Sequence, residues 1–289
     1  MKFVEVTNDI AFRKIFGNDN KKKSLISFLN AVIDFPENDQ IVDVEIINPY
    51  QLGKLSDGKS TIVDVKAKDQ KGNVFIVEMQ IAEFDFFHKR ILYYTSQSYV
   101  SQIDKGVDYN KLKPVYFIGI LEFEIGQNAA YFSRHKVLDI ETKEQIIQDV
   151  EFNFIELPKF NKTIDQLESS IDQWTYFIKN AESLSLIPDS VKDEGLKEAY
   201  SEADKQNWTK PELEDYERAS IKERDDIGRI EFAERRAAMR GEKIGEAKGE
   251  LRGEVNATLR IAKNFKDNGV PVEVIIKSTG LSQKEIEKL

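Results

Sequence analysis

Two acidic residues and one glutamine interrupt apolar runs that are typical of β-strands. Asp64 is flanked by valines, and Glu78 and Gln80 alternate with apolar residues in the next such run. A carboxylate in this setting is costly to bury unless it is paired or binds a cation. Residues two apart share one face of a strand, so Glu78 and Gln80 point the same way. A turn signal at 70–73 predicts a hairpin that places Asp64 beside Glu78.

Adjacent carboxylates repel each other unless a cation lies between them. A hard divalent ion takes oxygen ligands, so Asp64 and Glu78 predict a site for Mg²⁺, or for Mn²⁺ or Ca²⁺. Such an ion would polarise a phosphate oxygen and promote attack by water, which is the chemistry of phosphodiester hydrolysis. Gln80 could orient water or phosphate without adding charge. The alternative, on spacing alone, is an amphipathic hairpin whose two acids face solvent.

The elements that must hold these residues form a mixed α/β pattern up to residue 160. Residues 7–33 predict one helix or a broken pair of helices, and residues 84–105 predict a helix with an aromatic face. Strands are predicted, in chain order, at 42–46, 62–67, 74–81 and 115–123, with two further candidates at 130–140 and 146–157. This order indicates a mixed sheet flanked by helices, in a core that spans residues 1–160.

The region after residue 160 has mostly helical patterns. We divide it into a helical extension at 161–225, a charged glycine–glutamate repeat at 226–256 and a small module at 257–289. In the repeat, glycine returns every four residues from 241 to 253. Each glycine costs a helix about 1 kcal/mol relative to alanine, which favours a flexible linker. The same period places the glycines near one stripe of a helix, which favours a face that a second helix could approach closely.

The last module has the pattern of a helix-turn-helix. Asn268-Gly269 stops one helix, Pro271–Ser278 predicts a second, and Thr279-Gly280 forms the turn. Ser282 and Glu285 have the spacing of a capping box at the start of a third helix. Such a module recognises DNA in some proteins and only packs in others. The third helix of this one is not basic.

Composition narrows the class of protein. The chain has 289 residues, of which 40% are hydrophobic and 32% charged, with no cysteine and a net charge of −9. The lack of cysteine excludes disulfides, thiolate metal sites and a cysteine nucleophile, and it fits a reducing cytoplasm. No apolar run approaches the roughly 20 residues that cross a bilayer, so we expect a cytoplasmic protein with no membrane partner. Because the chain is acidic, any DNA-binding surface must be a local patch.

Two other patterns resemble known sites but lack their context. Gly53–Ser60 fits the phosphate loop G-x-x-x-x-G-K-[ST], which works only where a helix follows it. Here a strand is predicted to follow, so we expect no nucleotide cofactor. The two histidines, His88 and His135, are too few and too isolated for a zinc site.

The sequence resembles the PD-(D/E)XK nuclease superfamily, and specifically its Rpn branch of recombination-promoting nucleases and putative transposases. The order and spacing of several short motifs carry the resemblance, which covers nearly the whole chain. These motifs are Thr7–Gly17 with Leu29-Asn30, Asp64, Glu78-Met79-Gln80, Arg90–Tyr94, Trp208-Thr209, Glu214, Tyr216, the glycine–glutamate repeat and Thr279–Ser282. The resemblance implies a restriction-endonuclease-like core and metal-dependent cleavage of DNA, associated with recombination or mobile elements.

The resemblance also implies roles at the site. It makes Asp64 and Glu78 the metal ligands and puts Gln80 where most of the superfamily has a lysine. This departure leaves a positive charge unassigned, for which Lys14, Lys66 and Lys68 are candidates. The other accessory candidates are Asp9, Arg90 and Gln97. Asp9 could reach the site or only help to cap its helix. Arg90 could grip phosphate with His88 and Lys89, or these three could form the charged rim of the amphipathic helix that also carries Gln97.

Two functions of different classes stay open. The first is a DNA endonuclease, which would need a homodimer to cut both strands because each chain has one site. The arm from 226 to 263 could form that dimer, and it is locally positive, with nine basic and six acidic side chains between Arg229 and Lys263. The second is a non-catalytic DNA-binding or protein-interaction scaffold with a nuclease-like fold. Acids gathered around a cation-sized gap favour the enzyme, and acids splayed into solvent favour the scaffold.

Overall fold

The computed structural model describes residues 2–47, 50–51, 61–83 and 85–289. Two features of the sequence, the Gly53–Ser60 loop and Phe84, lie outside the described residues. The chain divides into two compact units, one up to Glu223 and one from Arg224. Within the described parts of the chain, no helix has both the length and the apolar composition needed to cross a bilayer.

The first unit is built on a mixed sheet of six strands. These are β1 (Val44–Ile47), β4 (Val65–Asp69), β5 (Val74–Gln80), β6 (Val115–Leu121), β7 (Phe132–Lys136) and β8 (Val150–Glu156), while β2 (Tyr50–Gln51) pairs separately with β3 (Thr61–Ile62). Its helices are α1 (Asp9–Phe16), α2 (Lys23–Val32), α3 (Phe87–Val100), α4 (Ser170–Asn180), α5 (Glu194–Ala203) and the start of α6 (Lys210–Asp267). The predicted fold class, a mixed sheet flanked by helices, is confirmed.

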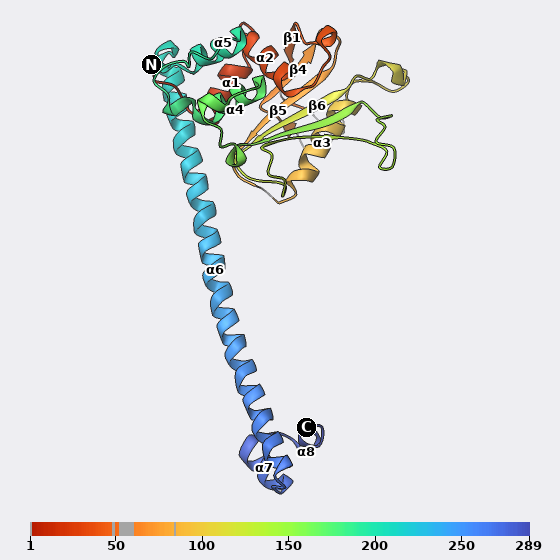
Figure 1. Cartoon of the computed structure of the whole chain (residues 1–289), viewed down its shortest axis with the longest axis vertical. Coiled ribbons are helices and arrows are strands. Elements are labelled where there is room, and N and C mark those ends of the chain that lie inside the picture. The colour runs from red at the N-terminus through yellow and green to blue at the C-terminus, as the bar shows by residue number, and fades with distance from the viewer. Residues whose placement is uncertain (1, 48–49, 52–60, 84) are drawn as a thin grey trace. The chain divides into compact units, whose positions relative to one another are not determined.

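The sheet has the order β1-β4-β5-β6-β8-β7, with β4 and β5 antiparallel and β5, β6 and β8 parallel (Figure 1). The β4–β5 turn contains Gly72, whose φ of 85° is a left-handed conformation that glycine adopts without strain. Val65 pairs with Val77 in this hairpin. One step further along the same register, Asp64 stands opposite Glu78, so the predicted hairpin is confirmed.

The predicted strand at 62–67 is wrong in its extent. β3 ends at Ile62, β4 begins at Val65, and Asp64 lies at a bend between them. Every flanking residue favours a strand, so propensity alone predicts a continuous one. The side chain of Asp64 overrides it, because its carboxylate accepts the main-chain N–H of Met79 at 2.9 Å in place of a strand carbonyl.

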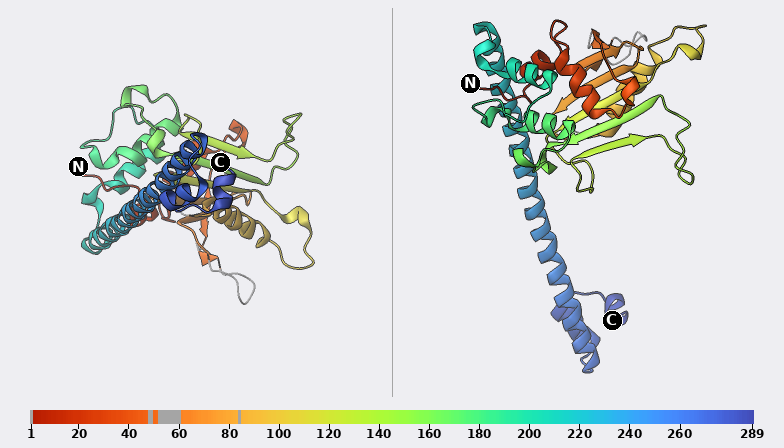
Figure 2. Two further views of the ribbon diagram at one scale, coloured as in Figure 1. Left: turned by 90° about the horizontal axis from the view of Figure 1, so that it is seen from below. Right: turned by 45° about the horizontal axis from the view of Figure 1, so that its top comes forward.

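The strand β5 presents alternate residues to two separate cores. Phe75 and Val77 belong to the larger core on one face, and Val74 and Ile76 belong to the smaller core on the other. Helices α1, α2, α4 and α5 pack in the larger core and α3 in the smaller one, and Figures 1 and 2 show them on the two sides of the sheet. Because Glu78 follows Ile76 by two residues, its side chain faces the α3 side.

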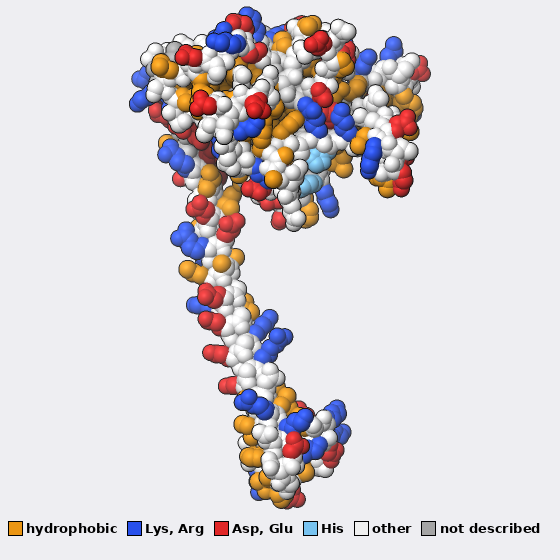
Figure 3. All heavy atoms as spheres, viewed as in Figure 1, with side chains coloured by type: hydrophobic (Ala, Val, Ile, Leu, Met, Phe, Trp, Pro, Cys, Tyr) orange, Lys and Arg blue, Asp and Glu red, His pale blue; other side chains and the backbone are white. Residues whose placement is uncertain are grey.

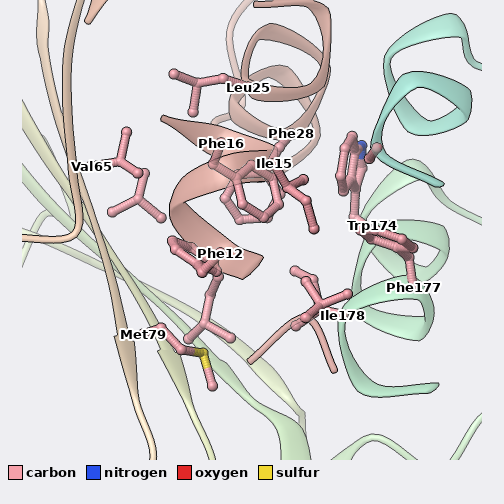
Figure 4. Close-up of a cluster of buried hydrophobic side chains, with 14 of the residues drawn as sticks. Phe12, Ile15, Phe16, Leu25, Phe28, Val65, Met79, Trp174, Phe177 and Ile178 are labelled. Atoms are coloured by element: carbon pink, nitrogen blue, oxygen red, sulfur yellow. The ribbon is translucent and has the colours of Figure 1, made fainter. Parts of the chain in front are cut away.

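Aromatic rings of α1 lie at the centre of the larger core. Phe12 and Phe16 are buried with their ring centroids 4.7 Å apart, and the centroid of Phe16 is 5.7 Å from that of Trp174 in α4. Figure 4 shows Phe12 between the helix axis and Met79 of the sheet. This packing fixes α1 next to the end of β5.

The second unit is helical. After α6 ends at Asp267 come α7 (Val272–Thr279) and α8 (Gln283–Glu287), with a small core of Ala262, Ile275 and Ile286. The predicted capping box is present, because the main-chain N–H of Ser282 donates to Glu285 Oε2 at 2.8 Å and the serine side chain caps in return. The helix-turn-helix pattern is therefore a real local structure.

The glycine–glutamate repeat lies inside α6 and is helical. Figure 3 shows charged side chains of both signs along this helix. A Cβ added at Gly241, Gly245, Gly249 or Gly253 would meet no atom within 4 Å in the described chain. Large apolar side chains are exposed along the same helix, among them those of Ile230, Phe232, Met239, Ile244, Leu251 and Val255.

Candidate active site

Asp64 is held at the open end of the β4–β5 hairpin. Its side chain is only 10% exposed, and its Oδ2 accepts the main-chain N–H of Met79 at 2.9 Å. Burial raises the pKa of Asp64, while the hydrogen bond from Met79 lowers it. The second carboxylate oxygen, Oδ1, faces Arg13 of α1, whose Nη2 lies 3.2 Å away. The carboxylate is thus held on one oxygen by the main chain of β5 and on the other by Arg13.

Glu78 lies beside Asp64 and is more deeply buried, with 4% of its surface exposed. Burial and the neighbouring charge of Asp64 raise the pKa of Glu78 to about 8. One oxygen, Oε2, accepts a hydrogen bond from Gln80 Nε2 at 3.1 Å. The other, Oε1, is buried and has no hydrogen-bond partner among the described residues. A buried carboxylate oxygen without a donor is costly unless a cation satisfies it.

Gln80 connects Glu78 to helix α3. Its Nε2 donates to Glu78 Oε2 and to the main-chain oxygen of Met79, at 3.1 and 3.0 Å. Its Oε1 accepts from Nη2 of Arg90 at 2.7 Å. The guanidinium of Arg90 also lies over the ring of Tyr94, 5.6 Å from its centroid. Arg90 therefore reaches the site through Gln80, and its positive charge lowers the pKa of Glu78.

Arg13 is a site residue that the sequence interpretation missed. It stands in α1, and the salt bridge to Asp64 joins residues 51 positions apart. Half of its side chain remains exposed, so it borders the open side of the acidic pair. A signal was present, because Asp9 and Arg13 are four residues apart and share one face of the helix.

The residues around this site match a known family. A family model described as PD-(D/E)XK nuclease family transposase matches residues 6–233. The chain belongs to this family. The match runs from just before α1 to the middle of α6, so it includes every residue of the acidic site and leaves α7 and α8 outside. No curated protein and no solved structure matches the chain.

Membership in this transposase family accounts for the nuclease-like sheet but does not by itself assign the accessory residues. Asp9 is exposed at the first position of α1, and its charge raises the pKa of Asp64. The cap of α1 is Asn8, whose Oδ1 accepts from the main-chain N–H of Ile10 at 3.0 Å. Asp9 lies in the first turn of α1 and does not supply its side-chain cap, and a role for Asp9 at the site stays a prediction.

Lys14 does not point into the acidic site. Its Nζ forms an ion pair with Glu212 and lies 4.9 Å from the centroid of the Trp208 ring. Successive helix residues are about 100° apart, so Lys14 faces the start of α6 while Arg13 faces Asp64. Gln97 lies about two turns beyond Arg90 on α3, on the same flank of the helix.

Lys66 and Lys68 lie on β4, two and four residues beyond Asp64. Lys66 pairs in register with Ile76, so its side chain is on the α3 side of the sheet. Burial, together with the nearby charge of Lys68, lowers the pKa of Lys66 to about 8. Lys66 has no ion-pair partner within the described chain.

The donor set fits one hard divalent cation. Among the described residues, no group of three or more acidic or histidine side chains is arranged to hold a metal. Mg²⁺ does not need such a group, because proteins commonly hold it through one or two carboxylates together with water and substrate phosphates. Asp64 and Glu78 could supply the two carboxylates, and Oε1 of Glu78, which has no donor among the described residues, is the observation that favours a cation there.

Proposed function

We propose that the chain is a divalent-metal-dependent DNA endonuclease. The observation that carries this proposal is the pairing of two buried acids across one hairpin, with a Glu78 oxygen that has no donor among the described residues. A solvent-facing hairpin would leave both carboxylates hydrated and their pKa values low. The membership in a nuclease family of transposases supports DNA as the substrate and an association with recombination or mobile elements.

In this proposal Asp64 and Glu78 hold Mg²⁺, or another divalent ion such as Mn²⁺ or Ca²⁺. The ion supplies Lewis-acid polarisation of the scissile phosphate. The chain's own groups do the positioning, since the Met79 N–H holds one oxygen of Asp64 and Gln80 holds one oxygen of Glu78. Glu78 Oε1, which has no donor among the described residues, and Asp64 Oδ1, once released by Arg13, would be the oxygens that hold the ion.

Arg13 is the cation best placed to meet the DNA backbone. Its guanidinium is half exposed and already lies against a carboxylate at the site, so a phosphate could take the place of that carboxylate. An ion bound at Asp64 would weaken the Asp64–Arg13 pair and release the guanidinium for phosphate. The overall acidic charge of the chain makes such local cations necessary for DNA binding.

Cleavage of both DNA strands would require two copies of the chain, because each copy has one acidic pair. We propose that α6 from Arg224 onward mediates a homodimer. Its support is the exposure of Ile230, Ile244, Leu251 and Val255, together with four glycines that no contact within the described chain requires. Glycine in a helix costs about 1 kcal/mol, and close approach of a second helix would offset that cost.

The alternative is a scaffold that binds DNA or protein without cutting. Buried, adjacent acids disfavour it, since a scaffold gains nothing from two carboxylates with raised pKa values. The experiment that separates the two is incubation of supercoiled plasmid with the full chain and Mg²⁺, Mn²⁺ or Ca²⁺, beside Asp64→Ala and an EDTA control. The enzyme nicks the plasmid only with metal and only with Asp64, whereas the scaffold leaves it intact under every condition.

A further inference from the structure

The amide of Gln80 has its orientation fixed by three partners. Arg90 carries only donors, so the amide oxygen must face its guanidinium, 2.7 Å away. The main-chain oxygen of Met79 is only an acceptor, so the amide nitrogen must face it. The same nitrogen then points its second hydrogen at Glu78 Oε2. Gln80 is thus a hydrogen-bond donor to the acidic pair, and its oxygen is not offered to a metal.

This arrangement places a positive charge behind a neutral amide. Arg90 polarises the amide by bonding to its oxygen, which strengthens the N–H groups that Gln80 directs at Glu78. The guanidinium charge also lies only one amide away from Glu78, through hydrogen bonds of 2.7 and 3.1 Å. A lysine ammonium at position 80 would donate a hydrogen bond to Glu78 and place a positive charge beside it with one group.

We propose that Arg90 is a positioning residue that acts through Gln80, and that the pair together performs the work of a single lysine beside Glu78. The proposal rests on the endonuclease function argued above. It assigns Arg90 a role inside the catalytic centre rather than a grip on phosphate. Gln80 holds Oε2 of Glu78 in place, which leaves Oε1 for the metal. Arg90 keeps the amide of Gln80 in the donor orientation.

Two other cations lie near the acids but do not fit this role. Arg13 donates to Oδ1 of Asp64, the other acid of the pair. Lys66 shares the sheet face, yet no hydrogen bond or ion pair joins it to Glu78 or Gln80 within the described chain. Among these three cations, Arg90 is the one joined to the carboxylate of Glu78 through Gln80, by hydrogen bonds of 2.7 and 3.1 Å.

Substitutions at position 80 separate a donor from a metal ligand. If Gln80 acts as a donor, Gln80→Lys retains cleavage within about tenfold of the natural chain, and Gln80→Glu loses about 100-fold or more in kcat. If Gln80 instead offers its oxygen to the metal, the order reverses, because a carboxylate is a better ligand than an amide and an ammonium is none. An active Gln80→Glu beside an inactive Gln80→Lys overturns the proposal.

Substitutions at position 90 test whether Arg90 acts through Gln80. We expect Arg90→Met to lose about 100-fold in kcat, Arg90→Lys to recover part of it, and Gln80→Lys to restore the Arg90→Met chain. A merely structural arginine would not be rescued by a charge placed at another position. Two results contradict the proposal. In the first, Gln80→Lys does not rescue a folded Arg90→Met variant. In the second, Lys66→Met loses all activity while Arg90→Met remains active.

A readout that needs no cleavage keeps this proposal separate from the endonuclease function. In protein labelled with ¹⁵N-glutamine, the side-chain amide pair of Gln80 is identified by its loss in Gln80→Glu. We expect well-dispersed signals in the natural chain that move toward those of an exposed glutamine in Arg90→Met. Unchanged signals in Arg90→Met refute the positioning role. An inactive natural chain with the expected amide shift refutes the endonuclease function alone.

Discussion

The main-chain N–H of Met79 donates a hydrogen bond of 2.9 Å to Oδ2 of Asp64, across the open end of the β4–β5 hairpin. This bond ties the side chain of Asp64 to β5 at the residue next to Glu78. The two acids lie next to each other: burial raises the pKa of both, and the charge of Asp64 raises the pKa of Glu78 further. The proposed metal site rests on this pairing of Asp64 with Glu78.

Glu78 should destabilise the metal-free protein as pH rises. Its pKa of about 8 in the folded chain exceeds the ordinary value of 4.5, so the folded state holds a proton that the unfolded state has released between these pH values. The stability that comes with this proton is present at pH 4.5 and below and is lost as pH rises through about 8. In EDTA, Glu78→Gln should therefore gain stability relative to the natural chain between pH 5 and pH 8, by a few kcal/mol at most.

Thermal unfolding at several pH values measures this difference, with the exposed Glu144→Gln as a matched control that should show none. A Glu78→Gln variant whose advantage stays constant or shrinks from pH 5 to pH 8 would show that Glu78 is ionised at neutral pH without metal. The description of Asp64 and Glu78 as a buried pair of neighbouring acids would then be wrong.

Arg13 should contribute to DNA binding through phosphate. We expect Arg13→Ala to weaken binding of a duplex in Ca²⁺ about tenfold and to lower the slope of log affinity against log salt by about 1. Fluorescence anisotropy across a salt series gives both quantities. Arg218→Ala is the control, because that arginine pairs with Asp215 on the surface of α6. Equal losses in the two variants would mean that Arg13 contributes only general positive charge.

Lys14 should matter for stability and not for chemistry. Lys14→Met removes the ion pair with Glu212 and the contact with the ring of Trp208, which should cost about 1–2 kcal/mol. Chemical denaturation measures this loss, and Glu212→Gln should reproduce most of it. The cleavage rate of the folded variant should match that of the natural chain. A tenfold slower rate with an unchanged fold would return Lys14 to the site.

The homodimer should depend on α6. Light scattering at micromolar concentration should give a dimer for the full chain and a monomer for a truncation that ends at Asp225, since the first compact unit closes at Glu223. Replacement of Leu251 and Val255 by glutamate in the full chain is the finer test, because it leaves the helix length unchanged. Monomers in every case mean that α6 does not join two copies.

The sequence predicts the hairpin well because its turn determines the register. Gly72 and Asp69 close the turn locally, and every pair beyond it follows by counting, which is why Asp64 was correctly placed opposite Glu78. The break before Val65 could not be predicted in the same way. It depends on a hydrogen bond from Met79, fifteen positions away, to a side chain whose neighbours all favour a strand.

The accessory residues were harder because their contacts are tertiary. Lys14 and Arg13 are neighbours in sequence, yet only the packing of α1 decides which of them meets Asp64. The sequence predicts Arg90 as an accessory residue of the site. Its hydrogen bond to Gln80 could not be predicted, because it depends on how α3 packs against β5. Two sets of predictions stay untested. One is the role in cleavage of Asp64, Glu78 and Gln80, and the other is the division of the chain at residues 160, 225 and 256.

The most direct test of the central claim is the rate of plasmid nicking in Mn²⁺ or Mg²⁺ by four matched proteins: the natural chain, Asp64→Asn, Glu78→Gln and the control Glu144→Gln. The substitutions keep side-chain size and remove only the charge that would hold the metal. We expect the natural chain and the control to nick at equal rates, and each site variant to lose about 10³-fold or more, or roughly 4 kcal/mol of transition-state stabilisation. Nicking by Asp64→Asn and Glu78→Gln at the rate of the control, or nicking that persists in EDTA, would contradict the account.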